Sequence, residues 1–119
     1  MAFKMCNSVI RDPQGRVKFK RLSGPGADHY HIGVWVEADD PAQMERVTHV
    51  EYTLHPSFGN RLRRSDNRKN DFSITFWAWG VFEVEARVFV QGQPEPDVIT
   101  HFLDIKLPAD TGTNYVDVT

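Results

Sequence analysis

The sequence predicts an all-β fold, an immunoglobulin-like β-sandwich of about seven or eight antiparallel strands. Two observations indicate this class: hydrophobic residues recur with a period of two, and turn residues separate the runs at short intervals. In addition, no stretch with helical periodicity reaches about a dozen residues. The chain has 119 residues, 40% of them hydrophobic, which fits a single domain with its own core over residues 1–119.

The expected strands each carry hydrophobic side chains at every second position. They cover residues 32–36, 50–54, 72–76, 82–90 and 99–107, after an N-terminal strand and the segment 17–22. The alternation is clearest in residues 82–90, where an apolar face opposes a mostly charged one. Such alternation is typical of sheets with one buried and one solvated face.

The connecting segments contain the residues that turns require. Tight turns are expected at residues 12–15 (Asp-Pro-Gln-Gly), 23–26 (Ser-Gly-Pro-Gly) and 91–94 (Gln-Gly-Gln-Pro). Asp40 followed by Pro41 predicts one helical turn, with Asp40 as the N-cap and Pro41 at the first helical position. Residues 108–119 are polar and are expected to form a loose tail.

Composition argues against several classes of partner. The net charge is -2 and the isoelectric point is near 6.2, which does not favour specific nucleic-acid binding. No apolar run approaches the roughly 20 residues that span a bilayer, and residues 1–10 lack the apolar stretch of a signal peptide. Cys6 is the only cysteine, so no intrachain disulfide forms. We therefore expect a cytoplasmic protein that binds no membrane.

Two aromatic loops are the main candidates for a ligand site. Residues 54–59 (Leu-His-Pro-Ser-Phe-Gly) follow an expected strand and place Phe58 in a loop. Residues 76–82 (Phe-Trp-Ala-Trp-Gly-Val-Phe) join two strands and contain four aromatic side chains. Rings at a loop end form a slot for a flat group, with hydroxyl and imidazole groups nearby to fix polar atoms. The alternative is packing, in which Phe58 plugs the core, one tryptophan caps it and the other covers a sheet.

Two further groups of polar residues have alternative interpretations. His29 and His31 face the same way on an expected strand, so they either bind a metal with His55 or His101 or are ordinary surface histidines. A basic loop is either solvated or binds an acidic or phosphate-bearing partner. This loop contains Arg61, Arg63, Arg64, Arg68 and Lys69, with Asp66 as its only acidic residue.

The sequence offers little support for nucleophilic catalysis. Ser57 lies two residues from His55, but no Gly-x-Ser-x-Gly elbow surrounds it. No glycine-rich phosphate loop is present either. We therefore expect a protein that is not an enzyme and needs no cofactor.

Residues 30–107 resemble a YEATS domain, and they are most similar to its prokaryotic branch. Residues 32–36 resemble the early hydrophobic strand of the family, and residues 47–58 resemble the strand that leads into its His-x-Ser/Thr-Phe loop. Residues 72–82 have the spacing of the family's aromatic segment with Gly-Trp/Tyr-Gly/Ala-x-Phe. Residues 82–89 and 101–105 resemble the strands that follow. The combination of His-Pro-Ser-Phe and Trp-Gly-x-Phe at this spacing is what makes the resemblance specific.

The resemblance implies an immunoglobulin fold and a binding role, since eukaryotic members read acylated lysines in histone tails. Phe58 and Trp79 would form the two walls of an aromatic slot, parallel to one another, and Phe82 its floor. Ser57 and His55 would hold the ligand amide, while the backbone N–H of Trp79 would meet the acyl carbonyl. The residues expected to bind ligand are His55, Ser57, Phe58, Trp77, Trp79, Gly80 and Phe82.

This sequence departs from the family pattern at three positions. Ala78 replaces the usual glycine, Trp77 replaces a small polar residue and can block or deepen the slot, and Asp28 lies where eukaryotic readers place an aromatic residue. Our expectation is a recognition module for acylated lysine or a similar flat amide on a modified protein or peptide, in a bacterial signalling or conflict system. One alternative is an adaptor domain with a self-filled slot, and another is a metal-dependent small-molecule enzyme that uses His29 and His31.

Overall fold

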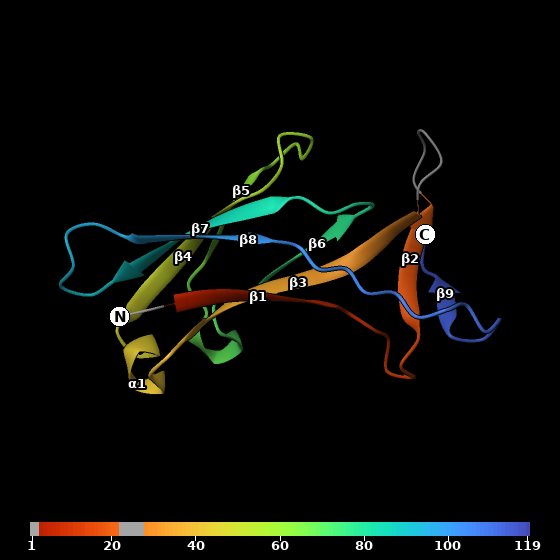
Figure 1. The fold of residues 1–119 in the computed structure, drawn as a ribbon, viewed down its shortest axis with the longest axis horizontal. Coiled ribbons are helices and arrows are strands. Elements are labelled where there is room, and N and C mark those ends of the chain that lie inside the picture. Colours follow the sequence, from red (N-terminus) through yellow and green to blue (C-terminus); the bar gives the residue numbers. More distant parts are fainter. Residues whose placement is uncertain (1–2, 22–27) are drawn as a thin grey trace.

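The computed structural model describes residues 3–21 and 28–119, which form two β-sheets packed face to face (Figure 1). In the first sheet the hydrogen-bonded order is β1 (Phe3–Val9), β3 (Asp28–Ala38), β2 (Val17–Arg21) and β9 (Tyr115–Asp117), and β6 (Ile74–Ala78) also pairs with β3. The second sheet has the order β5 (Leu62–Ser65), β4 (Val47–Thr53), β7 (Glu83–Val90) and β8 (Asp97–Phe102). The predicted immunoglobulin-like sandwich is confirmed.

The long strand β3 organises the first sheet. Its second half pairs with β1 along residues 32–38, and its first half pairs with β2 along residues 28–30. Between β1 and β2 the chain makes the predicted tight turn, in which the Asp12 side chain accepts the backbone N–H groups of Gln14 and Arg16. Gly15 has φ 79, a left-handed conformation that glycine adopts without steric cost.

The core lies between the two sheets and follows the period-two pattern. Val34 and Val36 of β3 are fully buried, as are Val50 of β4 and Val84 and Val88 of β7. Complete burial of a side chain of this size stabilises the fold by roughly 1.5–3 kcal/mol relative to leaving it exposed. The alternation in the sequence is therefore the main source of the fold.

Strand β6 begins later than the alternation predicts. Phe72 is buried as expected, but it lies before the strand, and both Asp71 and Phe72 have positive φ, 59 and 57. The turn is held by the Tyr52 hydroxyl, which donates a buried hydrogen bond of 2.6 Å to the Phe72 carbonyl oxygen. The chain therefore leaves the helical turn η1 (Arg68–Asn70) through two left-handed residues before it enters the sheet.

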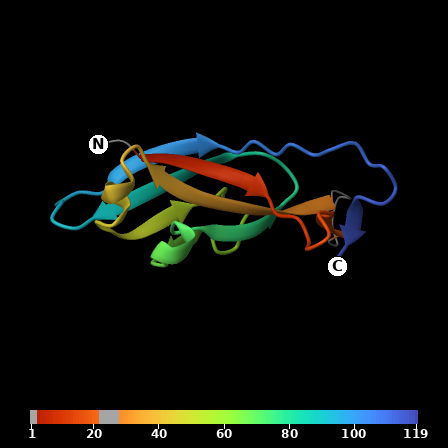
Figure 2. The same ribbon diagram turned by 90° about the horizontal axis from the view of Figure 1, so that it is seen from below.

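The C-terminal region differs from two expectations. Strand β8 ends at Phe102, whereas alternation predicted a strand to residue 107. Residues 108–119, expected as a loose tail, contain β9, which pairs in parallel with β2. In Figures 1 and 2 the blue segment after β8 runs along the molecule to reach β2 at its far end. The contacts that hold it include hydrogen bonds from the Val17 N–H to the Asn114 carbonyl and from the Tyr115 hydroxyl to the Pro108 carbonyl.

The connection between β3 and β4 contains the short helix α1 (Pro41–Met44), with Asp40 as its N-cap, as predicted. The Asp40 side chain accepts the Ala42 N–H at 3.0 Å. The turn predicted at residues 23–26 and the end of segment 17–22 lie outside the described residues. Within residues 3–21 and 28–119, no helix has the length and apolar character needed to cross a bilayer.

Candidate functional site

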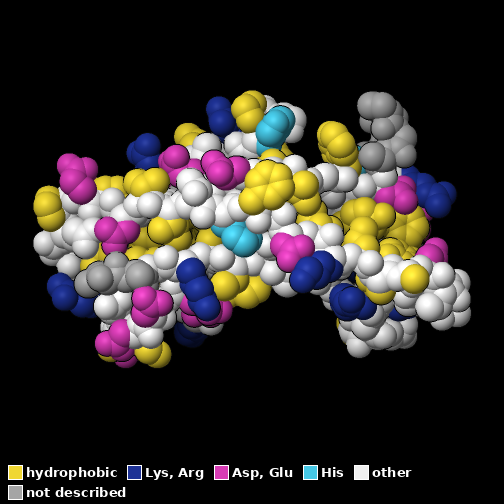
Figure 3. Space-filling view, viewed as in Figure 1, with side chains coloured by type: hydrophobic (Ala, Val, Ile, Leu, Met, Phe, Trp, Pro, Cys, Tyr) yellow, Lys and Arg dark blue, Asp and Glu magenta, His cyan; other side chains and the backbone are white. Residues whose placement is uncertain are grey.

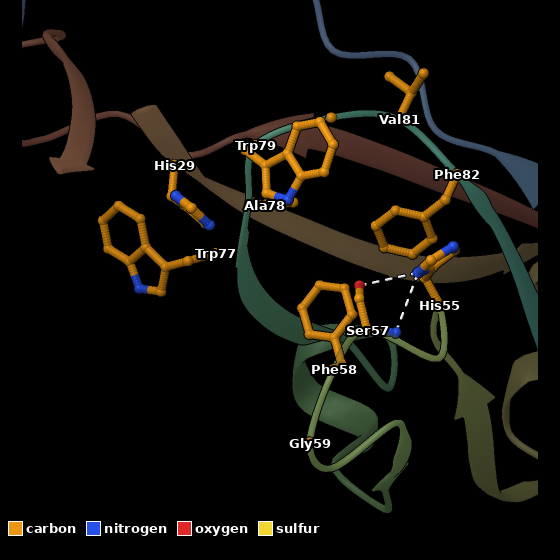
Figure 4. A pocket seen from close by; sticks show the side chains of 11 residues that line it. His29, His55, Ser57, Phe58, Gly59, Trp77, Ala78, Trp79, Val81 and Phe82 are labelled. Carbon is orange, nitrogen blue, oxygen red and sulfur yellow. Dashed lines mark hydrogen bonds between the residues drawn. The ribbon is translucent and has the colours of Figure 1, made fainter. Parts of the chain in front are cut away.

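A pocket with a volume of about 500 Å³ opens between the β4–β5 loop and the β6–β7 connection (Figure 4). All seven residues expected to bind ligand line it, although the two loops are far apart in the sequence. The lining residues are His29, His55, Ser57, Phe58, Gly59, Trp77, Ala78, Trp79, Gly80, Val81 and Phe82. The predicted loops therefore do meet at one place.

His55 and Ser57 form a closed hydrogen-bonded unit on one side of the pocket. The backbone N–H of Ser57 donates to His55 Nδ1 at 3.1 Å, so this nitrogen carries a lone pair and no proton. The Ser57 hydroxyl lies 2.9 Å from the same nitrogen and therefore acts as a donor to it. The two lone pairs of the Ser57 oxygen stay available to a hydrogen-bond donor in the pocket.

Phe58 serves the core and the pocket together. Its ring packs edge-on against Phe76 at 5.6 Å and in a tilted arrangement against Phe82 at 5.4 Å, measured between ring centroids. The ring is half-buried and keeps one part toward the pocket (Figure 4). Phe58 therefore packs against rings of the core and also lines the pocket.

Trp79 lies across the open space from Phe58. Its side chain is 66% exposed, and Figure 4 shows the indole and the phenyl ring on opposite sides of the pocket, with Phe82 beside them. Among the described residues no ring contact joins Trp79 to Phe58. The two rings enclose a gap, but they do not form a contacting pair.

Trp77 is held away from the middle of the pocket. Its ring stacks on His31 with 4.6 Å between centroids and 6° between planes, and the Lys20 ammonium lies 4.4 Å from its centre. Burial lowers the pKa of His31, and the nearby charges of Lys18 and Lys20 lower it further. Trp77 therefore covers the sheet and forms one end of the pocket without filling it.

Ala78, which replaces the usual family glycine, is accommodated without strain. It is buried in β6 opposite Tyr30, and it is not among the non-glycine residues with positive φ. It is one of the residues that line the pocket. The substitution therefore leaves the strand intact at the position where the pocket begins.

His29, Gly59, Ala78 and Val81 also line the pocket, and sequence reasoning did not place them in the slot. The register gives the signal that could have found His29, because Tyr30 pairs with Ala78 and the preceding residue then lies next to Trp79. The residues that the structure describes contain no group of three histidine, cysteine or acidic side chains able to hold a metal ion.

The family sequence model of the prokaryotic YEATS domain matches residues 30–104 of this chain. The chain belongs to the prokaryotic YEATS family. Of the residues around the pocket of this YEATS domain, all but His29 fall inside the matched segment. Strands β1, β2 and β9 lie outside it and extend the first sheet.

Solved structures agree with the fold of this YEATS domain. The crystal structure of yeast Yaf9, an AF-9 homolog, has a TM-score of 0.59 and 16% identity, covering 87% of this chain and 69% of that chain. The Yaf9 YEATS domain bound to H3K27ac has a TM-score of 0.54 and 14% identity, covering 95% of this chain and 81% of that chain. The Yaf9 YEATS domain recognising an H3K122suc peptide has a TM-score of 0.52 and 15% identity, covering 90% of this chain and 78% of that chain. No curated protein matches the sequence.

Proposed function

We propose that this protein is a non-catalytic recognition module that binds an acylated lysine, or a similar flat amide, on a protein or peptide. The observation that carries the proposal is the open pocket of about 500 Å³ between two loops, with Phe58, Trp79 and Phe82 around it. Because Trp77 is held by His31, the described side chains leave this space open, which speaks against a self-filled adaptor slot.

The polar groups at the pocket suit an acyl amide. The Ser57 oxygen accepts the amide N–H of the ligand, because its own proton is directed to His55 Nδ1. The backbone N–H of Trp79 donates to the acyl carbonyl oxygen. Acylation removes the lysine charge, so an apolar pocket does not have to solvate a cation.

The expected affinity is modest. Each buried CH₂ of the acyl chain contributes roughly 0.8 kcal/mol, and an amide hydrogen bond adds about 0.5–1.5 kcal/mol. Association costs offset a large part of this gain, so the dissociation constant for a short peptide is on the order of tens to hundreds of micromolar.

The comparisons support the ligand class. Two of the similar structures are Yaf9 YEATS domains, one bound to H3K27ac and one recognising an H3K122suc peptide. The bacterial setting that we infer is a signalling or conflict system in the cytoplasm, with residues 1–119 acting as one domain. The family match to a prokaryotic domain supports the bacterial part of this setting.

The test is an NMR titration with acetyl-lysine, crotonyl-lysine and unmodified lysine peptides. We expect the acylated peptides to shift the signals of residues 55–58 and 77–82, and the unmodified peptide to leave them unchanged. If acylated peptides cause no shifts in these two loops, the protein is not an acyl reader.

A further inference from the structure

A second cavity lies on the outer face of the β5–β4–β7 sheet, close to the aromatic pocket. Its volume is about 300 Å³. Its lining is mostly charged and contains Glu51, Thr53, Leu62, Arg63, Arg64 and Arg87. We call it the arginine cavity. Three arginines and Glu51 line it, and Glu85 lies 3.5 Å from Arg87, so the cavity has a small excess of positive charge, although the whole chain has a net charge of -2.

The basic charges of this region are only partly neutralised within the protein. None of the five basic residues between positions 61 and 69 has a carboxylate within 4.0 Å, considering residues 3–21 and 28–119. Instead, Arg63 Nε donates to the Asn60 carbonyl at 2.6 Å, and Arg61 Nε donates to the Leu54 carbonyl at 3.2 Å. Neutral carbonyl groups therefore orient these guanidinium groups and leave their charge uncompensated.

Two acidic residues offset part of the positive charge. The strand register places Glu51 of β4 between Arg64 of β5 and Arg87 of β7, and Glu85 lies 3.5 Å from Arg87. These carboxylates balance Arg87 and part of the charge of Arg64. Arg64 shares the outer face with Glu51, whereas Arg63 pairs with the buried Tyr52, so the charge that stays available to an anion on this face is mainly that of Arg64.

The arginine cavity is next to the aromatic pocket along the chain. Thr53 lines the cavity and His55 lines the pocket, so the two sites are two residues apart, or roughly 7 Å along an extended chain. On the other side of the loop, Gly59 lines the pocket and Leu62 lines the cavity. A peptide that extends from the pocket at about 3.3 Å per residue reaches the cavity within two to four residues.

We propose that the ligand of the pocket is a peptide with an acidic residue two to four positions from the acylated lysine, and that the arginine cavity binds this acidic side chain. The inference rests on the proposed function. A carboxylate fits the paired N–H donors of a guanidinium group, whereas a lysine or arginine at the same position is repelled. The protein therefore selects acylated lysines in an acidic sequence context.

The test compares peptides that differ at one position. Each carries one acetyl-lysine, with glutamate, alanine or lysine three residues before or after it, and a fourth peptide has the glutamate without the acetyl group. For one of the two flanks we expect the glutamate peptide to bind about fivefold more tightly than the alanine peptide. The gain disappears at about 1 M salt, where the screening length is about 3 Å.

Charge reversal identifies the residue responsible. The variant Arg64→Glu should lose the preference for glutamate and bind the lysine-flanked peptide best. The matched control Lys69→Glu changes the net charge equally and belongs to the same basic segment, but it lies outside the cavity lining. It should change the glutamate preference less than twofold. The alanine-flanked peptide reports the aromatic pocket alone and should bind all three proteins equally.

The outcomes separate the two proposals. If all acetylated peptides shift the Trp79 signal and bind with the same affinity, the acidic-context inference is wrong and the acyl-reader proposal stands. If no acetylated peptide shifts the signal of Trp79, the acyl-reader proposal fails. If, in that case, acidic peptides still shift the signals of Thr53 and Arg87, the proposed link between the two sites is overturned as well. The inference would also be overturned if inorganic phosphate shifted the cavity signals as much as the acidic peptides do and if the flanking residue made no difference to peptide affinity.

Discussion

The imidazole of His55 accepts two hydrogen bonds from Ser57, one from its backbone N–H at 3.1 Å and one from its hydroxyl at 2.9 Å. The backbone donor fixes the tautomer, because Nδ1 must carry its lone pair, and the tautomer fixes the direction of the hydroxyl proton. A serine hydroxyl can usually rotate and either donate or accept. Here it faces the pocket as an acceptor, which is the role that an amide N–H requires.

Replacing Ser57 tests this acceptor. Ser57→Ala removes the oxygen and leaves the ligand amide N–H without a partner, so we expect affinity for an acetyl-lysine peptide to fall by roughly tenfold. Ser57→Thr keeps the hydroxyl and should retain most of the affinity. The measurement is calorimetry or NMR titration of each variant. Equal binding by the wild type and Ser57→Ala would exclude this hydroxyl as a ligand contact.

Trp79 is expected to contribute to binding and little to stability. Its side chain is 66% exposed, so Trp79→Ala should change the free energy of unfolding by less than about 0.5 kcal/mol. The same variant should lose more than roughly tenfold in affinity for acylated peptides. Val98→Ala is a control, because Val98 is 56% exposed on β8 and lies outside the pocket. If Trp79→Ala bound acylated peptides as tightly as the wild type, the indole of Trp79 would not be a ligand contact.

The Tyr52 hydroxyl is expected to stabilise the turn before β6. Burial raises the pKa of Tyr52, so its hydroxyl stays protonated and donates to the Phe72 carbonyl. Tyr52→Phe should lower the free energy of unfolding by about 1–2 kcal/mol in urea denaturation, because it leaves a buried carbonyl without its donor. Tyr115→Phe removes a part-buried hydrogen bond of the same length and should cost less. A larger loss for Tyr115→Phe would contradict this ranking.

His31 gives stability a dependence on pH. Its pKa in the folded protein is lowered by burial, so the unfolded chain binds the proton more tightly. Stability is therefore complete above the unfolded pKa of about 6.5 and decreases as the pH falls from there toward the folded pKa. The variant His31→Gln should lose this part of the slope when unfolding is followed in urea at several pH values. If the free energy of unfolding depended on pH identically in both proteins, the pKa of His31 would not change on folding.

Much of the fold was predictable because burial and alternation coincide in the central strands. The period of two places Val34, Val50 and Val84 on buried faces. Alternation could not show that Asp71 and Phe72 adopt left-handed conformations, because that depends on the Tyr52 hydroxyl from another strand. The pairing of β9 with β2 was also hidden, since a short polar segment gains its strand only from a distant partner.

The loops of the candidate site were predictable from their residue types, but the arrangement of the side chains was not. Trp77 and Trp79 share a parity in the sequence, yet only Trp77 stacks on His31 and only Trp79 stands exposed. The difference arises because β6 ends at Ala78, after which Trp79 follows the turn and not the sheet. His29 joins the pocket through the register of β3, which no local pattern reveals.

The environments of the three tryptophans make the protein suitable for optical measurement. Trp79 is the most exposed of them, while Trp35 donates to Glu37 at 2.9 Å and Trp77 is stacked. Trp35 and its partner Glu37 lie outside the pocket lining, so a molecule that enters the pocket should leave the emission of Trp35 unchanged. The face of the protein that Figure 3 shows has its charged side chains dispersed among hydrophobic and other polar ones. A molecule that enters the pocket excludes water from the indole of Trp79 and should therefore shift the fluorescence of the unlabelled protein to shorter wavelength.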